Sequence, residues 1–109
     1  MKRAICFLFI LWTVLTLAAC GNNDKTVFTA TVLENSGSLL VEPQKDSDEY
    51  KSSDKIAVHA NDAAIYDING KHIDLSDIEV GRTVKITYNG MIAESYPAQI
   101  TASKIEVVE

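Results

Sequence analysis

Cysteine is the residue type in this chain whose position says most about chemistry. The 109 residues include two cysteines, Cys6 and Cys20. A thiol can close a disulfide, bind zinc or act as a nucleophile. Both cysteines lie within or directly after Ala4–Ala19, a run without a charged residue. The fate of that run therefore decides which thiol chemistry the protein keeps.

The uncharged run follows two positive residues, Lys2 and Arg3, and ends in small residues. A positive start, an apolar stretch and small residues before a cut are typical of a secretory signal peptide. The stretch is shorter than the roughly 18–20 residues that a membrane-spanning helix needs. We therefore predict that residues 1–19 are a signal peptide that is removed. The alternative is a membrane anchor retained through failed cleavage.

The end of the run, Leu17-Ala18-Ala19-Cys20-Gly21, resembles the bacterial lipobox, in which a leucine, two small residues and a cysteine mark the cleavage site. In lipoproteins of that kind diacylglycerol alkylates the thiol, and cleavage leaves the cysteine first in the chain. We therefore expect Cys20 to anchor the protein to the extracytoplasmic face of the cell membrane. No thiol would then remain for a disulfide, a zinc site or a nucleophile. An ordinary signal peptide would instead leave Cys20 free and reactive.

His59 and His72, the two histidines, have neither the spacing of a zinc motif nor a cysteine partner. We interpret both as exposed, solvated side chains. Gly37-Ser38 lacks the strained turn that presents a hydrolase nucleophile. The sequence thus predicts no catalytic residue and no cofactor, and a small hydrolase is a disfavoured alternative.

The polar segment Gln44–Asp54 contains the carboxylates Asp46, Asp48 and Glu49. Hard oxygen ligands of this kind could hold Ca²⁺, so a divalent-cation-binding module is an alternative function. Asp67-Ile68-Asn69-Gly70 is similar to the start of an EF-hand loop, but its glycine comes at the fourth position rather than the sixth. The competing interpretation is a solvated acidic loop that keeps a small domain soluble.

Tyr96 precedes Pro97, which holds the residue before it in an extended conformation. Two roles remain open for this tyrosine. It is either a structural plug at the entry to the last strand or an aromatic platform for a ligand, with Glu94 and Ser95 beside it.

Short strands are the elements that must position these residues. Runs rich in Val, Ile, Thr and Tyr alternate between apolar and polar positions, as half-buried strands do. The predicted strands are Thr26–Glu34, Ser38–Val41, Lys55–Ala60 and Thr83–Tyr88. Turn sequences that accept positive φ punctuate the chain at Asn35-Ser36-Gly37, Asn69-Gly70 and Asn89-Gly90.

The last run changes its alternation partway along. Ala98, Ile100 and Ala102 share one face, whereas Ile105 and Val107 have the opposite parity. One inserted residue would place both sets inside, so we predict a β-bulge or sharp bend near Ser103-Lys104. The alternatives are two separate strands or an exposed Ile105.

Asp74–Val80 predicts one helical turn, capped by Asp74 or Ser76 and ended by Gly81. Five strands with a helical turn between the third and the fourth favour an all-β, mainly antiparallel fold, a small OB-like five-stranded barrel over residues 26–109. A small β-sandwich or an SH3-like barrel is the alternative. OB domains bind ligands on strands two and three and the adjacent loops, which would add Tyr50 to Glu94 and Tyr96 as candidate ligand-binding residues.

Charge excludes one class of partner. Without the signal peptide, residues 20–109 carry eight Lys and Arg against fifteen Asp and Glu, a net charge of −7. An acidic domain does not attract the phosphates of nucleic acids or anionic lipids. We therefore expect no nucleic-acid partner.

Several segments are similar to those of a known family: the lipobox, Phe28–Glu34, Ser38–Pro43, Ser53–Ile56, Leu75–Ile78, Val80-Gly81 and Glu94–Ile100. Together they resemble the YobA-like small lipoproteins of Gram-positive bacteria, over essentially the whole chain after Cys20. The resemblance implies one secreted, lipid-anchored, β-barrel-like domain of unknown function. We expect a non-enzymatic binding or structural module, with residues 20–25 as lipidated cysteine and tether. Its partners would be the membrane, through diacylglycerol on Cys20, and an envelope protein or glycan.

Overall fold

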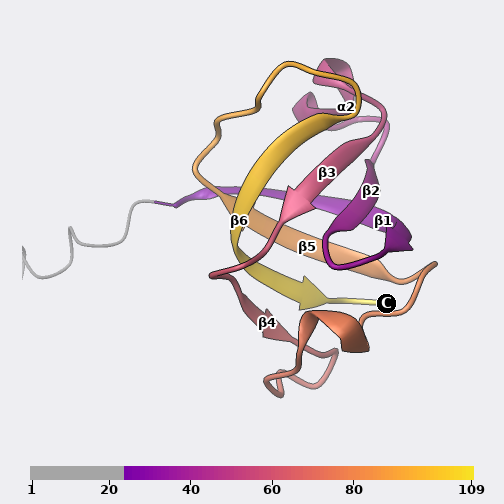
Figure 1. Ribbon diagram of the computed structural model, residues 1–109, viewed down its shortest axis with the longest axis vertical. Coiled ribbons are helices and arrows are strands. Elements are labelled where there is room, and N and C mark those ends of the chain that lie inside the picture. Colours follow the sequence, from indigo (N-terminus) through magenta and orange to yellow (C-terminus); the bar gives the residue numbers. More distant parts are fainter. Residues whose placement is uncertain (1–23) are drawn as a thin grey trace, which may run out of the picture.

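Strands dominate the part of the chain that the computed structural model describes, residues 24–109. The elements are β1 (Thr26–Asn35), β2 (Leu39–Pro43), α2 (Asp48–Ser52), β3 (Ile56–His59), β4 (Ala64–Tyr66), η1 (Leu75–Asp77), β5 (Thr83–Tyr88) and β6 (Ala98–Val107) (Figure 1). The predicted signal peptide, Cys20 and most of the tether lie outside the described residues. No helix within residues 24–109 has both the length and the apolar character needed to cross a membrane.

Five of the strands close into a barrel in the order β1–β2–β3–β6–β5, with β5 paired back to β1. Neighbours around the barrel run antiparallel except β3 and β6, which are parallel from Ile56↔Ala98 to His59↔Thr101. The extra strand β4 also runs parallel to β6. A closed five-stranded barrel with so little helix is an OB-like architecture, so the predicted fold class is confirmed.

Alternation along the strands places the core inside the barrel. Phe28, Ala30 and Val32 of β1 are buried, as the sequence pattern predicts. Tyr88 of β5 is the largest fully buried side chain, and its ring meets that of Phe28 edge to face with centroids 5.5 Å apart. The β6 residue opposite Tyr88 is Ala102, whose small side chain leaves space for the phenol ring.

The predicted bulge in β6 is confirmed. Thr87 pairs with Lys104, but the next residue, Tyr88, pairs with Ala102, so Ser103 is the inserted residue. Its hydroxyl donates to the carbonyl oxygen of Thr87 at 3.3 Å. Because of this insertion, the buried side chains on both sides of Ser103 all face the core; they are Ala98, Ile100, Ala102, Ile105 and Val107.

Two short elements were not predicted. The segment Gln44–Asp54, expected to be an irregular connection, contains the five-residue helix α2. Ser47 caps α2 by accepting a hydrogen bond from the Tyr50 backbone N–H, 3.1 Å away. β4 has only three residues, held between β6 and a bridge from Tyr66 to His72. Neither element is long enough to show a periodic pattern in the sequence.

The predicted helical turn is the 3-10 turn η1, with Asp74 as its N-cap. The Asp77 carboxylate accepts a hydrogen bond from the Asp74 backbone N–H at 3.0 Å. The turn ends at Asp77 rather than at Gly81, whose N–H donates to the Val32 carbonyl oxygen of β1. The Asn35 side-chain amide donates to two carbonyl oxygens of the turn, both at 2.9 Å, and fastens η1 to the end of β1.

Deletion of Ser103 tests the role of the bulge. Without the inserted residue, Ile105 and Val107 would turn outward, and each buried side chain of this size contributes about 1.5–3 kcal/mol. We expect the free energy of unfolding in urea to fall by at least about 3 kcal/mol. The control Ser103→Ala keeps the insertion and loses only the hydroxyl, at a cost of about 1 kcal/mol or less. Equal losses in the two variants would contradict this account.

Candidate functional site

A groove of about 340 Å³ lies on the outside of the barrel, over β3, β6 and the loop 89–97 between β5 and β6. His59 of β3 and Gln99 and Thr101 of β6 form its polar wall, and Met91 and Ile92 of the loop form part of its apolar wall. The groove opens on the side of the molecule where β3 and β6 run next to each other (Figure 1).

Strand alternation and parallel pairing bring the polar wall together. His59 lies opposite Thr101, while the preceding residues Val58 and Ile100 are buried in the core. The His59 Nε2 atom lies 2.9 Å from the Gln99 Oε1 atom. Because an amide oxygen can only accept, Nε2 donates in this arrangement. The interpretation of His59 as an exposed side chain is confirmed, and Gln99 is the polar group that it contacts.

Backbone and side-chain hydrogen bonds fix the loop 89–97 at both ends. The Asn89 side-chain oxygen accepts from the Met91 N–H at 2.9 Å. Ala93 and Gln99 exchange two backbone hydrogen bonds, at 2.8 and 3.2 Å. Between these fixed points the Met91 side chain is 73% exposed. A large apolar side chain is therefore presented to solvent from an ordered loop.

Tyr96, predicted to be a plug or a platform, lies outside the barrel with 69% of its surface exposed, so it is not a plug. Its hydroxyl donates to Asp54 Oδ1 at 2.8 Å, and this hydrogen bond raises the pKa of Tyr96. Glu94 of the same loop lines a second depression, of about 510 Å³, together with Ser52 and Ser95. Glu94 and Tyr96 therefore share one loop, beside the groove.

Tyr50, the third candidate, is placed elsewhere. It is half-buried on α2, and it lines neither the groove nor the depression beside it. Sequence reasoning missed Met91, Gln99 and Thr101 as site residues. The outward position of His59 in the strand pattern was the only local indication of the groove. The groove also requires β6 to lie beside β3, and no local sequence pattern predicts that pairing.

The three candidate calcium ligands lie near each other in sequence but point to different surroundings. Asp46 and Asp48 are exposed, and Asp48 lies 3.7 Å from the ammonium group of Lys51. Glu49 is only 7% exposed and accepts a hydrogen bond from the Tyr88 hydroxyl at 2.8 Å. Within residues 24–109, no group of three or more His, Cys, Asp or Glu side chains is arranged to hold a metal ion. Calcium binding by this segment stays a prediction.

The hydrogen bond between Tyr88 and Glu49 joins α2 to the interior of the barrel. Tyr88 is 1% exposed, so both partners lie away from water. Burial, followed by the hydrogen bond to Glu49, raises the pKa of Tyr88 well above its usual range. A buried carboxylate without a donor would be costly, and the phenol hydroxyl supplies that donor. Glu49, in the middle of the segment predicted to bind calcium, therefore stabilises the fold through this hydrogen bond.

The fold and the groove define a small OB-like barrel with an ordered, exposed loop beside an outer cleft. The chain belongs to the family described as "Protein of unknown function (DUF3221)", whose model matches residues 29–109. The match covers the barrel from Thr29, the fourth residue of β1, to the end of the chain. Neither the curated proteins nor the solved structures contain a match to this chain.

Alkaline unfolding tests the bond between Tyr88 and Glu49. An unfolded tyrosine loses its proton near pH 10, whereas the folded Tyr88 holds it to higher pH. The stabilisation is therefore complete below about pH 10 and is lost as the pH rises further, by up to about 1.4 kcal/mol per pH unit. We expect Tyr88→Phe to remove this dependence and to cost about 1–3 kcal/mol at pH 7.

Urea unfolding between about pH 7 and 11 measures the difference between wild type and variant. Tyr66→Phe is the matched control, because it removes a hydroxyl from a half-buried tyrosine on β4. It should keep the wild-type dependence on pH. Parallel curves for the wild type and Tyr88→Phe would refute the buried bond.

Proposed function

We propose that this chain is a lipoprotein of the YobA-like kind, which holds an OB-like barrel on the extracytoplasmic face of the membrane and binds an envelope protein. The binding surface is the groove beside β3 and β6, and the role is binding rather than catalysis. The observation that carries the binding proposal is Met91, 73% exposed on a loop that hydrogen bonds hold beside the groove.

The lipobox supports the anchor. Leu17-Ala18-Ala19-Cys20 follows a positive start and an uncharged run, at the position where a lipoprotein signal peptide is cut. Two acyl chains on Cys20 would hold the protein on a bilayer, because each buried methylene contributes about 0.8 kcal/mol. A domain held in this way meets other envelope components at high local concentration.

The distribution of exposed apolar side chains supports the groove as the binding surface. Single exposed apolar residues are common on protein surfaces. Here Met91 and Tyr96, the two most exposed large ones among residues 24–109, lie on the same loop. Loops held by a rigid scaffold are frequent binding elements, and methionine adapts its flexible side chain to irregular partner surfaces.

A protein fits this groove better than a glycan does. Methionine and tyrosine are enriched at protein interfaces. The apolar wall contains Met91 and Ile92 rather than an aromatic ring on which a sugar could stack. Gln99 and Thr101 provide donors and acceptors for a peptide backbone along the polar wall.

The hydrogen bonds of the potential catalytic side chains also agree with a binding role. His59 is bonded to Gln99, and the Ser95 hydroxyl donates to the Pro97 carbonyl oxygen at 2.8 Å. A nucleophilic serine would need a hydrogen bond to a base that accepts its proton. The hydrogen bonds of His59 and Ser95 therefore keep these side chains in place, as expected of a binding surface.

Mass spectrometry of the protein isolated from membranes tests the anchor. We expect the first residue to be Cys20 carrying diacylglycerol. Cys20→Ser should move the protein from the membrane fraction to the soluble fraction, because the acyl chains supply the membrane affinity. Asn22→Ser, two residues along the tether, is the control and should stay with the membrane. A terminal Cys20 with a free thiol would disprove the anchor.

Photo-cross-linking on intact cells tests the groove. A photoreactive residue at Met91 should give one discrete adduct with a protein, and the second substitution Gln99→Ala should reduce its yield. The control position is Val80, which is 62% exposed but lies in the segment between η1 and β5. Adducts of equal yield from both positions would overturn the proposal, and a glycan adduct at Met91 would overturn the choice of a protein partner.

A further inference from the structure

The chain contains two Asn-Gly pairs, Asn69-Gly70 and Asn89-Gly90. In such a pair the backbone nitrogen of the glycine can attack the asparagine side-chain carbonyl, because glycine has no side chain to hinder the approach. Both pairs are exposed, and both glycines have positive φ, 83° at Gly70 and 89° at Gly90. Dipeptide sequence, exposure and glycine conformation therefore do not distinguish the two pairs.

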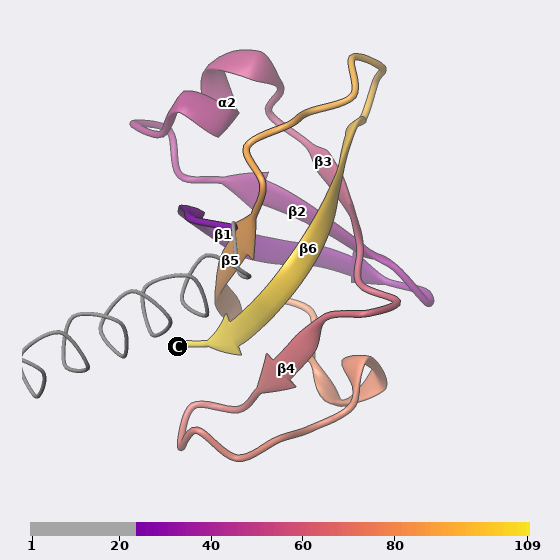
Figure 2. The ribbon, with the colours of Figure 1, turned by 90° about the vertical axis from the view of Figure 1, so that its left-hand side faces the viewer.

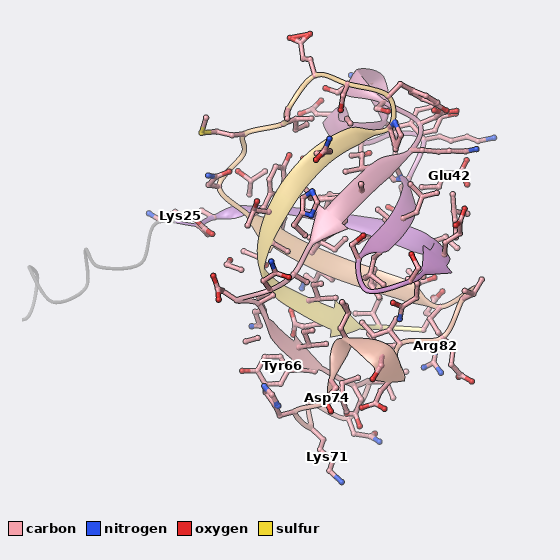
Figure 3. The ribbon with its side chains drawn as sticks, in the orientation of Figure 1. Lys25, Glu42, Tyr66, Lys71, Asp74 and Arg82 are labelled. Carbon is pink, nitrogen blue, oxygen red and sulfur yellow. The ribbon has the colours of Figure 1, made fainter. Side chains whose placement is uncertain are left out.

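The two pairs lie in different connections of the fold. Asn69-Gly70 is in the turn that follows β4, and Asn89-Gly90 begins the loop 89–97 beside the groove. Figure 2 shows the chain after β4 at the bottom of the barrel, whereas the chain between β5 and β6 runs toward the top. Figure 3 shows the side chain of Lys71, next to Gly70, pointing away from the barrel. Each turn is therefore held by its own hydrogen bonds.

Hydrogen bonds to Asp67 occupy the reacting groups of the first turn. The Gly70 N–H donates to the Asp67 backbone carbonyl oxygen at 2.9 Å. The N–H groups of Asn69 and Lys71 both donate to Asp67 Oδ1, each at 2.9 Å. The glycine nitrogen must lose its proton before it can attack, and its hydrogen bond holds that proton in place. Attack on Asn69 therefore requires this turn to open first.

The second turn has the opposite arrangement. Within residues 24–109, the Gly90 N–H donates to no backbone carbonyl oxygen outside its own turn and to no side chain. The Met91 N–H donates to Asn89 Oδ1 at 2.9 Å. The ring that this hydrogen bond closes contains both the Asn89 Cγ atom and the Gly90 nitrogen. The bond therefore holds the carbonyl carbon and a free nucleophile in one tight turn.

The Met91 N–H also assists the chemistry itself. When a nitrogen adds to the carbonyl carbon of Asn89, negative charge develops on Oδ1. A backbone N–H directed at such an oxygen stabilises the charge, as the donors of an oxyanion hole do. The equivalent N–H of the first turn belongs to Lys71 and is bonded to Asp67 instead. The hydrogen bonds therefore favour attack on Asn89 and oppose attack on Asn69.

We propose that Asn89 is a site of spontaneous deamidation, a covalent modification that changes the groove as the protein ages. The Gly90 nitrogen gives its proton to water, forms a bond to Asn89 Cγ and displaces the side-chain amide nitrogen, which takes up a proton and leaves as ammonia. The result is a cyclic succinimide. Water then adds to one of the two ring carbonyl groups and opens the ring, to aspartate or isoaspartate. The overall reaction consumes one water molecule and releases one ammonia.

Both products change the groove, because Asn89 lines it together with His59 and Met91. Each product adds one negative charge at neutral pH. In isoaspartate an extra methylene group enters the backbone, and the carbonyl that accepted the Met91 N–H becomes part of the main chain. The reaction itself needs no partner, whereas its effect on partner binding rests on the proposed function.

Peptide mapping by mass spectrometry tests the site in the purified protein, incubated at neutral pH and sampled over time. We expect Asn89 to react about tenfold faster than Asn69, because one hydrogen bond that must open corresponds to roughly this factor in rate. In urea both turns are unfolded, and the two rates should become similar. Similar rates in the folded protein would overturn the proposal, as would a difference of unchanged size in urea.

Asp67→Ala tests the cause of the difference. It frees the N–H groups of Asn69 and Lys71, so the rate at Asn69 should rise between about twofold and tenfold, while the rate at Asn89 stays unchanged. Asp62→Ala is the matched control, because it removes an exposed carboxylate from the turn before β4 and should leave both rates unchanged. Circular dichroism verifies the barrel in each variant. An unchanged rate at Asn69 in folded Asp67→Ala would refute the structural explanation.

Hydrogen exchange of single amides measures the effect on the groove. In freshly purified protein, the Met91 and Lys71 N–H groups are both bonded to a side-chain oxygen. We expect the Met91 amide to exchange faster in the isoaspartate form and the Lys71 amide to keep its rate. Unchanged exchange at Met91 in protein whose position 89 is isoaspartate would overturn the claim that the groove changes. These measurements need no partner, so a failure of the proposed function leaves their outcome intact.

Discussion

The closed barrel depends on the single residue that β6 inserts at Ser103. Side chains in a strand alternate strictly, so an uninterrupted β6 could keep Ile100 or Ile105 inside, but not both. The insertion lets the first part of the strand pair with β3 and the last part with β4, while β5 pairs along the other edge. The insertion of Ser103 therefore both closes the barrel and places the apolar side chains from both parts of β6 in the core.

A second interaction connects the barrel interior to its surface. The Tyr88 hydroxyl reaches Glu49 at 2.8 Å, which fastens α2 over one end of the barrel. Ser52, the last residue of α2, lines the same depression as Glu94, and Asp54, two residues further on, accepts the hydrogen bond of Tyr96. The orientation of an exposed tyrosine in the loop 89–97 thus follows, through α2, from a buried hydrogen bond. Glu49 can be buried at this position because the Tyr88 hydroxyl donates a hydrogen bond to its carboxylate.

The strands were predictable from the sequence because alternation is a local property. The pattern located β5 to the residue, and the parity change in β6 predicted the bulge from a few side chains. α2 and β4 were not predictable, since five and three residues cannot establish a period. Their formation depends on a capping serine in one case and on neighbouring chain in the other.

The site was less predictable than the fold, for a related reason. Glu94 and Tyr96 could be selected because a proline follows Tyr96, which is a local feature. Placing His59 beside Gln99 requires the parallel pairing of β3 and β6, which lie forty residues apart in the chain.

The bulge also divides the outer surface. Before Ser103 the outward residues of β6 are Gln99 and Thr101, which line the groove with β3. After Ser103 they are Lys104 and Glu106, which lie between β4 and β5 and approach each other to 3.8 Å. One strand therefore contributes to two surfaces of different chemistry, and the residue that closes the core also marks the boundary between them.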